Sequence, residues 1–489
     1  MKTTNRLFIF LLFMMSVSMP INGYSQASDQ SQVTDRLIDL KKCINFLEKT
    51  GNLVRVKSEV DPKYELAGIA KKYEGKKCVL FEKVKGSSFP VFIGLLWNRD
   101  TIGSIFDVPH EQVKNIMADA YNKWKMDKNA LPSRILDKGP ANEVIITKNI
   151  NLYDLPVPTH ALKDGGPYFD ASVMMVNDPQ TGIPNISIRE IEVVGNDQLV
   201  LAIDPGEGRH LEAYLEIKEK LKESLDVTIN NGVGLAPWLA STFSRTGPGK
   251  AAIASHMVGR PIDLIKSQTI SVPAFADAQF VIEGKILTRF WPSSGPFGEA
   301  SGYYTQRGKG LRFLVQVTAI THQKDPVFHS LLTGQEVWNV WGPRHEWAIM
   351  NIVKQKVPDI RAAYAPPSGW GVYGAVIQLD KSKEGVQNEA IEETFNKIPS
   401  LMWVVAVDTD VDIYDPADVA WAITTRCNAK RGLILLKNAK GFYAHPVARL
   451  EGNSVTKVGI DATAPYPRTR EFERVRFKDV NLKNYVIKE

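Results

Sequence analysis

One loop of the sequence combines residue types that suit acid–base chemistry. It reads WPSSGPFGEASGYY (residues 291–304), and its Gly295 and Pro296 predict a rigid turn after a strand. The turn holds Glu299 beside aromatic side chains. A carboxyl group against apolar rings is disfavoured as an anion, so its pKa rises and it can act as a general acid. From chemistry alone, a plain turn with a solvated glutamate is an equally good interpretation.

Two further motifs that suggest ligand binding have simpler explanations. GWGVYG (residues 369–374) matches the GxGxxG pattern, but it lacks the preceding strand and following helix of a dinucleotide site. The four aspartates of residues 408–415 resemble the start of a calcium loop, yet Ile413 stands where such a loop needs glycine. We interpret these acids as a strand end followed by an N-cap, because Asp415-Pro416 is typical of a helix start.

The composition is that of an ordinary globular protein. The chain has 489 residues, of which 44% are hydrophobic and 23% charged, so disorder is excluded and two or three domains are expected. The formal net charge of +6 is not concentrated in a basic run, so no nucleic-acid partner is predicted. The cysteines Cys43, Cys78 and Cys427 have no metal-binding spacing. We expect buried thiols, with a Cys43–Cys78 disulfide as the open alternative in an oxidising compartment.

The first 25 residues have the layout of an export signal. Lys2 and Arg6 precede an apolar run from Leu7 to Val17, which is shorter than the roughly 20 residues of a membrane span. Small residues follow as a cleavage site. We expect a Sec signal peptide at residues 1–25 and an exported, periplasmic chain with no stable membrane span after its removal. An uncleaved anchor is the alternative.

The hydrophobic pattern divides the chain into three stretches. Residues 35–50 predict a helix, and short strands followed by a helix at residues 111–126 complete a small α/β unit that ends near residue 131. Residues 143–330 are rich in strands, as in a meander or barrel, with one helix at residues 210–225. Helices and strands then alternate, as in βαβ units. The pattern predicts a mixed α/β (α+β) fold.

Several segments together resemble the UbiD family of prenylated-flavin decarboxylases, which includes the ferulic and cinnamic acid decarboxylases. In chain order these segments are DLKKCINFLEKTGNLVRV, VDPKYELAGIAKK, LPVPTHALKDGGPYF, NISI, GPFGEASGYY, DIYDPADVAWAITTRC and KVGIDATAP. Each is modest alone, but their order and spacing are specific. They cover nearly the whole mature chain.

The resemblance implies a fold and an activity. The implied domains are an N-terminal α/β domain (residues 26–131), a split β-barrel flavin-binding domain (132–330) and a C-terminal α/β domain used in homo-oligomerisation (331–489). The implied reaction is a non-oxidative, reversible decarboxylation of a small aromatic or α,β-unsaturated carboxylic acid, in which CO2 leaves and a glutamate returns a proton. The implied cofactor is prenylated FMN, whose phosphate is held with a divalent metal ion such as Mn²⁺ and a potassium ion.

The resemblance also assigns roles to individual residues. Glu299 falls on the proton-donating glutamate, and Asn185 and His210 fall on two metal ligands. The residues that fall on contacts to the flavin, its phosphate or the potassium ion are Ser187, Ile188, Arg209, Ala240, Ser241, Thr242, Phe243 and Lys397.

Three positions depart from the family pattern. Glu190 stands where the catalytic arginine is expected, and strand alternation predicts that the neighbouring Arg189 faces away. Ser294 stands where a second glutamate is expected, and Lys250 where the acid that is the third metal ligand is expected. A protonated lysine cannot ligate a metal ion, but its ammonium can neutralise a phosphate. Glu190 would repel a substrate carboxylate, and Arg289 is the candidate replacement for the missing arginine.

Two functions follow from this pattern. The first is a divergent, exported carboxy-lyase in which Glu299 is the proton donor, and the retained Asn185 and His210 favour it. The second is an exported binding protein without catalysis, which keeps the scaffold but has lost the metal and prenyl-flavin chemistry. The departures at Glu190, Lys250 and Ser294 favour this second function.

Overall fold

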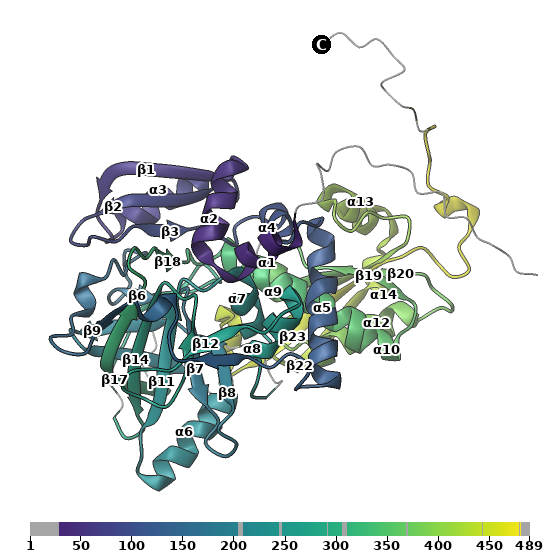
Figure 1. Cartoon of the computed structure of the whole chain (residues 1–489). Helices are drawn as coiled ribbons and strands as arrows, with labels where there is room; N and C mark the ends of the chain where they lie inside the picture. The colour runs from purple at the N-terminus through teal and green to yellow at the C-terminus, as the bar shows by residue number, and fades with distance from the viewer. Residues whose placement is uncertain are drawn as a thin grey trace, which may run out of the picture.

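The structure is a computed structural model that describes most of the chain, namely residues 29–203, 209–243, 247–290, 292–305, 311–367, 370–442, 444–478 and 480. The leader predicted at residues 1–25, Trp291, Gly369 and the side chain of Arg209 lie outside this description. Figure 1 shows a small N-terminal sheet, a large curved sheet below it and a C-terminal sheet to one side. The predicted mixed α/β fold is confirmed.

A four-stranded sheet in the order β1-β2-β3-β18 forms the N-terminal unit. Its last strand comes from far along the chain, because β18 (Phe328–Ser330) pairs in parallel with β3. Backbone hydrogen bonds therefore join this unit to the end of the middle region. Its other elements are α1 (Gln30–Ile38), α2 (Leu40–Lys49), β1 (Leu53–Val60), α3 (Glu65–Tyr73), β2 (Cys78–Val84), β3 (Val91–Ile93), α4 (Arg99–Phe106) and α5 (His110–Met126).

The single helix predicted at residues 35–50 is in fact two helices, α1 and α2, separated at Asp39. The backbone of Asp39 is extended, and its carboxylate accepts hydrogen bonds from the N–H groups of Lys41 and Lys42. This N-cap satisfies the first donors of α2 while the chain changes direction. Cys43 of α2 and Cys78 of β2 are both buried, as predicted, and both are free thiols.

The middle region is a nine-stranded antiparallel sheet in the order β6-β9-β10-β17-β14-β11-β7-β8, with β5 paired to β17. β8 (Pro184–Ile188) and β9 (Ile191–Gly195) lie towards opposite edges of this sheet, yet only Arg189 and Glu190 separate them. A connection of that length spans at most about 11 Å. The sheet must therefore curl until its edges approach each other, which is the split barrel that the family resemblance implies.

The remaining elements of the middle region surround this barrel. β4, β12 and β13 form a separate three-stranded sheet, and β15 and β16 form a short hairpin. The elements are β4 (Arg134–Leu136), η1 (Pro140–Asn142), β5 (Val144–Ile146), η2 (Leu152–Asp154), β6 (Tyr168–Phe169), β7 (Val173–Asn177), β10 (Gln198–Ile203), α6 (Arg209–Leu221), β11 (Leu225–Asn231), α7 (Leu235–Ser241), α8 (Ala251–Val258), β12 (Asp263–Ile265), β13 (Ala274–Phe275), β14 (Phe280–Leu287), β15 (Phe297–Gly298), β16 (Tyr304–Thr305) and β17 (Leu311–His322).

The C-terminal unit is a five-stranded sheet in the order β19-β20-β21-β23-β22. Strand β20, helix α12 and the parallel strand β21 form the βαβ unit that the alternating pattern predicts. Its elements are α9 (Gln335–Ala348), η3 (Ile349–Val353), α10 (Lys354–Lys356), β19 (Ile360–Tyr364), α11 (Trp370–Tyr373), β20 (Gly374–Leu379), α12 (Val386–Lys397), β21 (Trp403–Asp408), α13 (Pro416–Arg426), α14 (Ala429–Gly432), β22 (Leu433–Lys440), α15 (Pro446–Leu450), β23 (Ser454–Ala462) and η4 (Arg470–Phe472).

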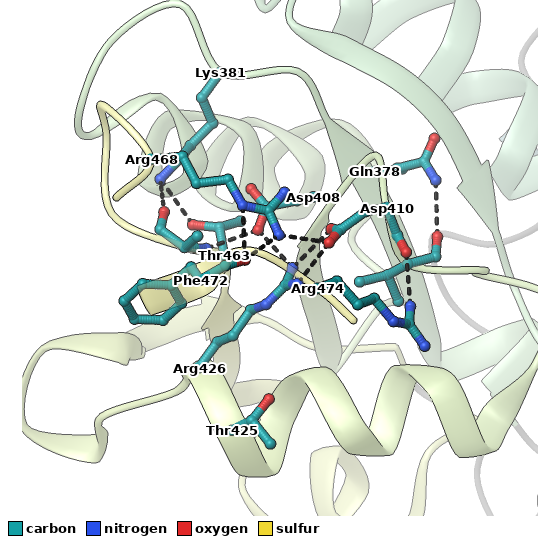
Figure 2. A network of polar contacts seen from close by, with 12 residues as sticks. Gln378, Lys381, Asp408, Asp410, Thr425, Arg426, Thr463, Arg468, Phe472 and Arg474 are labelled. Carbon is teal, nitrogen blue, oxygen red and sulfur yellow. Dashed lines mark hydrogen bonds and ion pairs between the residues drawn. The ribbon is translucent and has the colours of Figure 1, made fainter. Parts of the chain in front are cut away.

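The four aspartates of residues 408–415 have structural roles, as predicted. Asp415 is the N-cap of α13, and its carboxylate accepts a hydrogen bond from the second N–H group beyond it. Figure 2 shows Arg426 between Asp408 and Asp410. Its Nη1 lies 2.7 Å from Asp408 Oδ2, and its Nη2 lies 2.8 Å from Asp410 Oδ2. These carboxylates are paired with a guanidinium, which explains them without a calcium ion.

The chain positions at which the hydrophobic pattern changes can be located on this fold. β4 follows the predicted boundary near residue 131 and pairs with β12 of the middle region. The boundaries near residues 131 and 330 stay predictions. Within the described ranges, no helix has the length and apolar character needed to cross a membrane.

Candidate functional site

The loop that carries Glu299 is a tight hairpin between β15 and β16. The Glu299 N–H group donates to the Tyr303 carbonyl at 3.0 Å, and the Gly302 N–H group donates to the Glu299 carbonyl at 2.9 Å. The Glu299 side chain is half-buried. These hydrogen bonds involve only main-chain atoms. They therefore fix the backbone position of Glu299 independently of its side-chain conformation.

Three other elements fix the backbone around this hairpin. The Gly298 N–H group donates to Asp164 Oδ1 at 2.8 Å, and the Gly295 N–H group donates to Glu192 Oε2 at the same distance. The indole N–H group of Trp338 on α9 donates to the Ala300 carbonyl at 2.9 Å. The rigid turn predicted from Gly295 and Pro296 is therefore confirmed, with anchors on both sides of Glu299.

Aromatic side chains accompany the hairpin, although not all of them are buried. Phe297 is buried, and its ring centroid lies 4.6 Å from that of Tyr168. Tyr303 is 63% exposed, and the Tyr304 hydroxyl accepts a hydrogen bond from the main chain of Lys163. Phe297 is the aromatic residue of this hairpin that is buried, and both the apolar surroundings and the raised pKa of Glu299 stay predictions.

Ser294, which stands where a second glutamate is expected, lies beside a buried arginine. Arg312 Nε donates to Ser294 Oγ at 3.0 Å, and Arg312 is only 4% exposed. A guanidinium therefore adjoins the start of the Glu299 loop. Arg289, the candidate replacement for the missing arginine, is exposed after the end of β14 and has no described contact with this loop.

The two predicted metal ligands, Asn185 and His210, lie around one tyrosine. Tyr214 of α6 donates its hydroxyl hydrogen to Asp178 Oδ2 at 3.0 Å and also interacts with the Asn185 side chain. His210 precedes Tyr214 by one helical turn, and the two ring centroids are 6.3 Å apart. Burial and the Asp178 carboxylate raise the pKa of Tyr214, so its hydroxyl stays protonated. The structure therefore brings Asn185 and His210 into one region.

The side chains of β8 follow the alternation expected of a strand. Asn185 pairs with Val176 and Ser187 with Met174, and both of these partners belong to the core inside the barrel. Cross-strand partners project to the same side of a sheet, so Asn185 and Ser187 face the barrel interior. Ile188 packs on the opposite side, against the core that includes α7 and α8.

Arg189 and Glu190 lie at the seam of the barrel and not within a strand. β8 ends at Ile188, so the alternation that predicted Arg189 to face away does not apply there. The charge of Arg189 acts instead on Lys250, whose pKa it lowers. The Nε atom of Arg189 is buried and has no hydrogen-bond partner among the described residues. Arg189 therefore contributes positive charge to the site beside the position of Glu190.

Lys250 is buried at the N-cap of α8. It is only 5% exposed, and the preceding Gly249 donates its N–H to the Pro184 carbonyl at 2.8 Å, which fixes the start of α8 against the start of β8. Burial, followed by the positive charges of Arg189 and Arg344, lowers the pKa of Lys250 to about 7. A buried amine beside two guanidinium groups is an environment suited to an anion.

The predicted flavin and potassium segment lies at the end of α7. The hydroxyl groups of Ser241 and Thr242 donate to main-chain carbonyls three residues earlier, at 2.5 and 2.6 Å. The ring of Phe243 stacks on Tyr121 with 5.4 Å between centroids, and it lies edge-on to Trp347 of α9. Phe243 therefore joins α7 to α5 and α9 through an aromatic cluster, while the potassium contacts stay predictions.

Lys397, the predicted phosphate contact, lies at the end of α12. Its ammonium is 3.3 Å from Glu393 Oε1 on the same helix. α12 packs on β21, β23 and η3 of the C-terminal unit, and Figure 1 shows it well apart from β8. No described contact brings Lys397 to the group around Lys250.

The residues present fit an anionic cofactor better than a metal ion. Among the described residues, no three acidic, histidine or cysteine side chains are close enough together to hold a metal ion. Lys250 occupies the position at which the family pattern expects an acidic residue as the third metal ligand. The orphaned Oδ1 of Asn185 remains a possible ligand atom, but Asn185 and His210 alone do not make a divalent-metal site.

Arg344 and Trp338 are the site residues that the sequence did not predict. The segment HEWAIMNIVKQK (residues 345–356) predicts a helix that begins at His345. In the structure α9 runs through Gly342 and Pro343 and begins at Gln335. The recurrence of Trp338, Trp341 and Arg344 at intervals of three is the helical signal that could have found them.

Known proteins share the arrangement of this chain along nearly its whole length. Residues 44–120, 134–336 and 339–462 match, in turn, the N-terminal domain, the Rift-related domain and the C-terminal domain of 3-octaprenyl-4-hydroxybenzoate carboxy-lyase, UbiD. An uncharacterised protein in the cooM 5′ region of Rhodospirillum rubrum is 39% identical over 91% of this chain and 96% of its own length.

Two characterised proteins are also similar. Anhydromevalonate phosphate decarboxylase of Methanosarcina mazei is 32% identical over 88% of this chain and 97% of its own length. The structure of the UbiD-class enzyme HmfF from Pelotomaculum thermopropionicum in complex with FMN is 36% identical, has a TM-score of 0.85, and is covered over 100% of its length by 92% of this chain. The chain belongs to the UbiD family of carboxy-lyases, the non-oxidative decarboxylases.

Proposed function

We propose that this chain decarboxylates an aromatic or α,β-unsaturated carboxylic acid and that Glu299 returns the proton to the product. The observation that carries the proposal is the anchoring of the Glu299 hairpin by Asp164, Glu192 and Trp338. A proton donor must stay within hydrogen-bond reach of one atom of the substrate, and a backbone held from three elements provides that constraint.

A bound flavin is part of the proposal. A bound prenylated flavin would supply the electron-accepting group that loss of CO2 from such an acid requires. The cations around Lys250 offer charge for the phosphate. The FMN complex of the similar UbiD-class enzyme supports this assignment.

The test uses the mature chain coproduced with a prenyl-flavin synthase. We expect Glu299→Gln to lower turnover by about 10²- to 10⁴-fold, the usual contribution of a general acid, with an unchanged melting temperature and unchanged flavin absorbance. Glu48→Gln, a surface change at an exposed ion pair with Arg55, is the control and should retain full turnover. Full turnover in Glu299→Gln would refute the proposed role of Glu299.

The same preparation separates catalysis from binding alone. CO2 release is measured with a panel of cinnamic, hydroxybenzoic and heteroaromatic acids. Flavin absorbance combined with no CO2 release from any of them would favour the non-catalytic binding protein, for which Glu190 at the position of the expected arginine is the supporting observation.

Export and assembly are further parts of the proposal. We propose that the chain is exported and assembles into a homo-oligomer, dimer or larger. Exposed apolar side chains on the edge strand β22, Leu433 and Leu435, support a contact between copies. Cell fractionation tests the export, and light scattering of the purified chain tests the assembly. Recovery in the cytoplasm or a monomeric mass would refute the respective part.

A further inference from the structure

Three cations from separate elements converge near the barrel seam. Lys250 comes from the start of α8, Arg189 from the connection between β8 and β9, and Arg344 from α9. Lys250 is only 5% exposed to solvent. Burying positive charge in this way is unfavourable unless an anion accompanies it.

Polar atoms without partners surround the same place. Asn185 Oδ1 and Arg189 Nε are both buried without a hydrogen-bond partner among the described residues, and Asn185 itself is 7% exposed. The Gly249–Pro184 hydrogen bond holds the first residues of α8 against the strand that carries Asn185. The N-terminal end of α8 adds the partial positive charge of its helix dipole beside Lys250. A ligand that accepts hydrogen bonds would satisfy the Arg189 Nε–H donor, while Asn185 Oδ1 is an acceptor and needs a donor.

A protonated lysine at position 250 carries the same net charge as the expected acidic ligand together with its divalent metal ion. A divalent ion bound by one carboxylate contributes one net positive charge, and so does a single ammonium group. The exchange of the expected acid for Lys250 therefore preserves the charge available to a phosphate while it removes the need for a metal ion. Arg189 and Arg344 can both donate hydrogen bonds to phosphate oxygens.

We propose that Lys250, Arg189 and Arg344 bind the phosphate of a flavin mononucleotide directly, without a divalent metal ion. This inference rests on the proposed function only in that a flavin occupies the site. The direct contact replaces coordination by a metal ion with charge-assisted hydrogen bonds, of which a lysine offers three donors and an arginine five.

The test compares two flavins that differ by the phosphate alone. FMN and riboflavin are titrated into flavin-free protein in EDTA, and binding is followed by flavin fluorescence and calorimetry. We expect FMN to bind at least tenfold more tightly than riboflavin, and added MnCl2 to change the dissociation constant of FMN by less than twofold. The melting temperature of each variant is measured in parallel to establish that it is folded.

Variants at Lys250 separate direct binding from metal-mediated binding. Lys250→Glu restores the expected acid, so FMN binding should weaken at least 100-fold in EDTA and recover with MnCl2. Lys250→Met should lose FMN affinity without recovery, and it provides the result if the glutamate variant does not fold. Lys266→Glu makes the same charge change at an exposed lysine paired with Asp137, and it should bind FMN as the wild type does.

The outcomes distinguish this inference from the proposed function. FMN binding by the wild type that requires Mn²⁺ would overturn the direct contact and leave the proposed decarboxylation standing. Equal affinity for riboflavin and FMN would also overturn it, because the cations would then not hold the phosphate. Failure to bind either flavin would overturn both the inference and the flavin-dependent function.

Discussion

Replacing Arg426 with methionine should loosen the C-terminal unit more than any surface change of the same kind. The guanidinium contacts Asp408 at 2.7 Å and Asp410 at 2.8 and 3.0 Å, as Figure 2 shows. The Arg426 side chain is 2% exposed, and those of Asp408 and Asp410 are 12% and 7% exposed. Methionine keeps much of the apolar volume and removes the charge, so two carboxylates would be left close together.

The expected loss follows from the burial of these groups. Removing one partner of a buried ion pair costs about 3–5 kcal/mol, because the remaining charge has lost water without gaining a counter-ion. Arg468 still contacts Asp410 in the variant, so we expect about 3 kcal/mol. That value corresponds to roughly a 100-fold increase in the population of the locally open state.

The loss should also depend on pH. Burial raises the pKa of Asp410, but the hydrogen bonds and charges of Arg426 and Arg468 outweigh it and hold the pKa well below its usual value. A carboxyl group with a lowered folded pKa adds stability above its unfolded pKa of about 4 and loses it as the pH falls further. In Arg426→Met the pKa of Asp410 rises. Protonation of Asp410 at low pH then removes its repulsion with Asp408 and restores part of the stability of the variant. The difference from wild type should therefore shrink between about pH 7 and about pH 4.

Hydrogen exchange of peptides from β21 and α13 measures this local opening. Arg361→Met is the matched control in the same sheet, because Arg361 forms an exposed pair with Asp380 at 3.0 Å, and it should cost less than about 1 kcal/mol. The double variant with Asp410→Asn should recover part of the loss. The reasoning is refuted if Arg426→Met exchanges within about tenfold of the control or if its deficit is the same at both pH values.

Three further changes probe the site and its supports. Trp338→Phe removes the hydrogen bond to Ala300 beside Glu299, so kcat should fall by about 10- to 100-fold with unchanged FMN affinity, and an unchanged kcat would contradict the anchoring role. Burial penalises the charged form of Lys250, so Lys250→Met should raise the melting temperature of the flavin-free protein, and a lower melting temperature would contradict this. His329→Leu should abolish an acid sensitivity, because burial lowers the pKa of His329 to about 4. Below the unfolded value of about 6.5 the unfolded chain takes up a proton that the buried ring does not, so the folded state loses stability as the pH falls. Between pH 7 and pH 5 the free energy of unfolding should fall by about 2 kcal/mol more in the wild type than in the variant. Equal decreases of the two melting temperatures would contradict this prediction.

The sequence was sufficient wherever local chemistry determines local structure. The N-cap at Asp415 and the turn at Gly295 and Pro296 follow from residue types with strong conformational preferences, and the buried thiols of Cys43 and Cys78 follow from their apolar neighbours in sequence. The order of family-like segments was enough to identify the fold. None of these inferences needs a contact between distant parts of the chain.

The rest depends on contacts that spacing does not contain. Strand alternation failed at Arg189 because β8 ends one residue earlier, and that end depends on closure of the barrel. Helix-breaking residues concealed Arg344, because the packing of α9 outweighs the local cost of Gly342 and Pro343. The surroundings of Lys250 come from three elements far apart in sequence. A single sequence predicts such a cluster only when the fold is already known.

Helix α9 limits how this protein can be recombined with its relatives. The matched middle domain ends at residue 336 and the matched C-terminal domain begins at residue 339, so the border lies inside this helix. The helix holds Trp338 over the Glu299 loop, carries Arg344, and binds Arg99 of the N-terminal unit through Glu346 at 2.8 Å. A chimaera spliced at that border would combine one parent's hairpin with another parent's helix. A chimaera that exchanges the C-terminal domain should therefore take α9 from the same parent as the barrel.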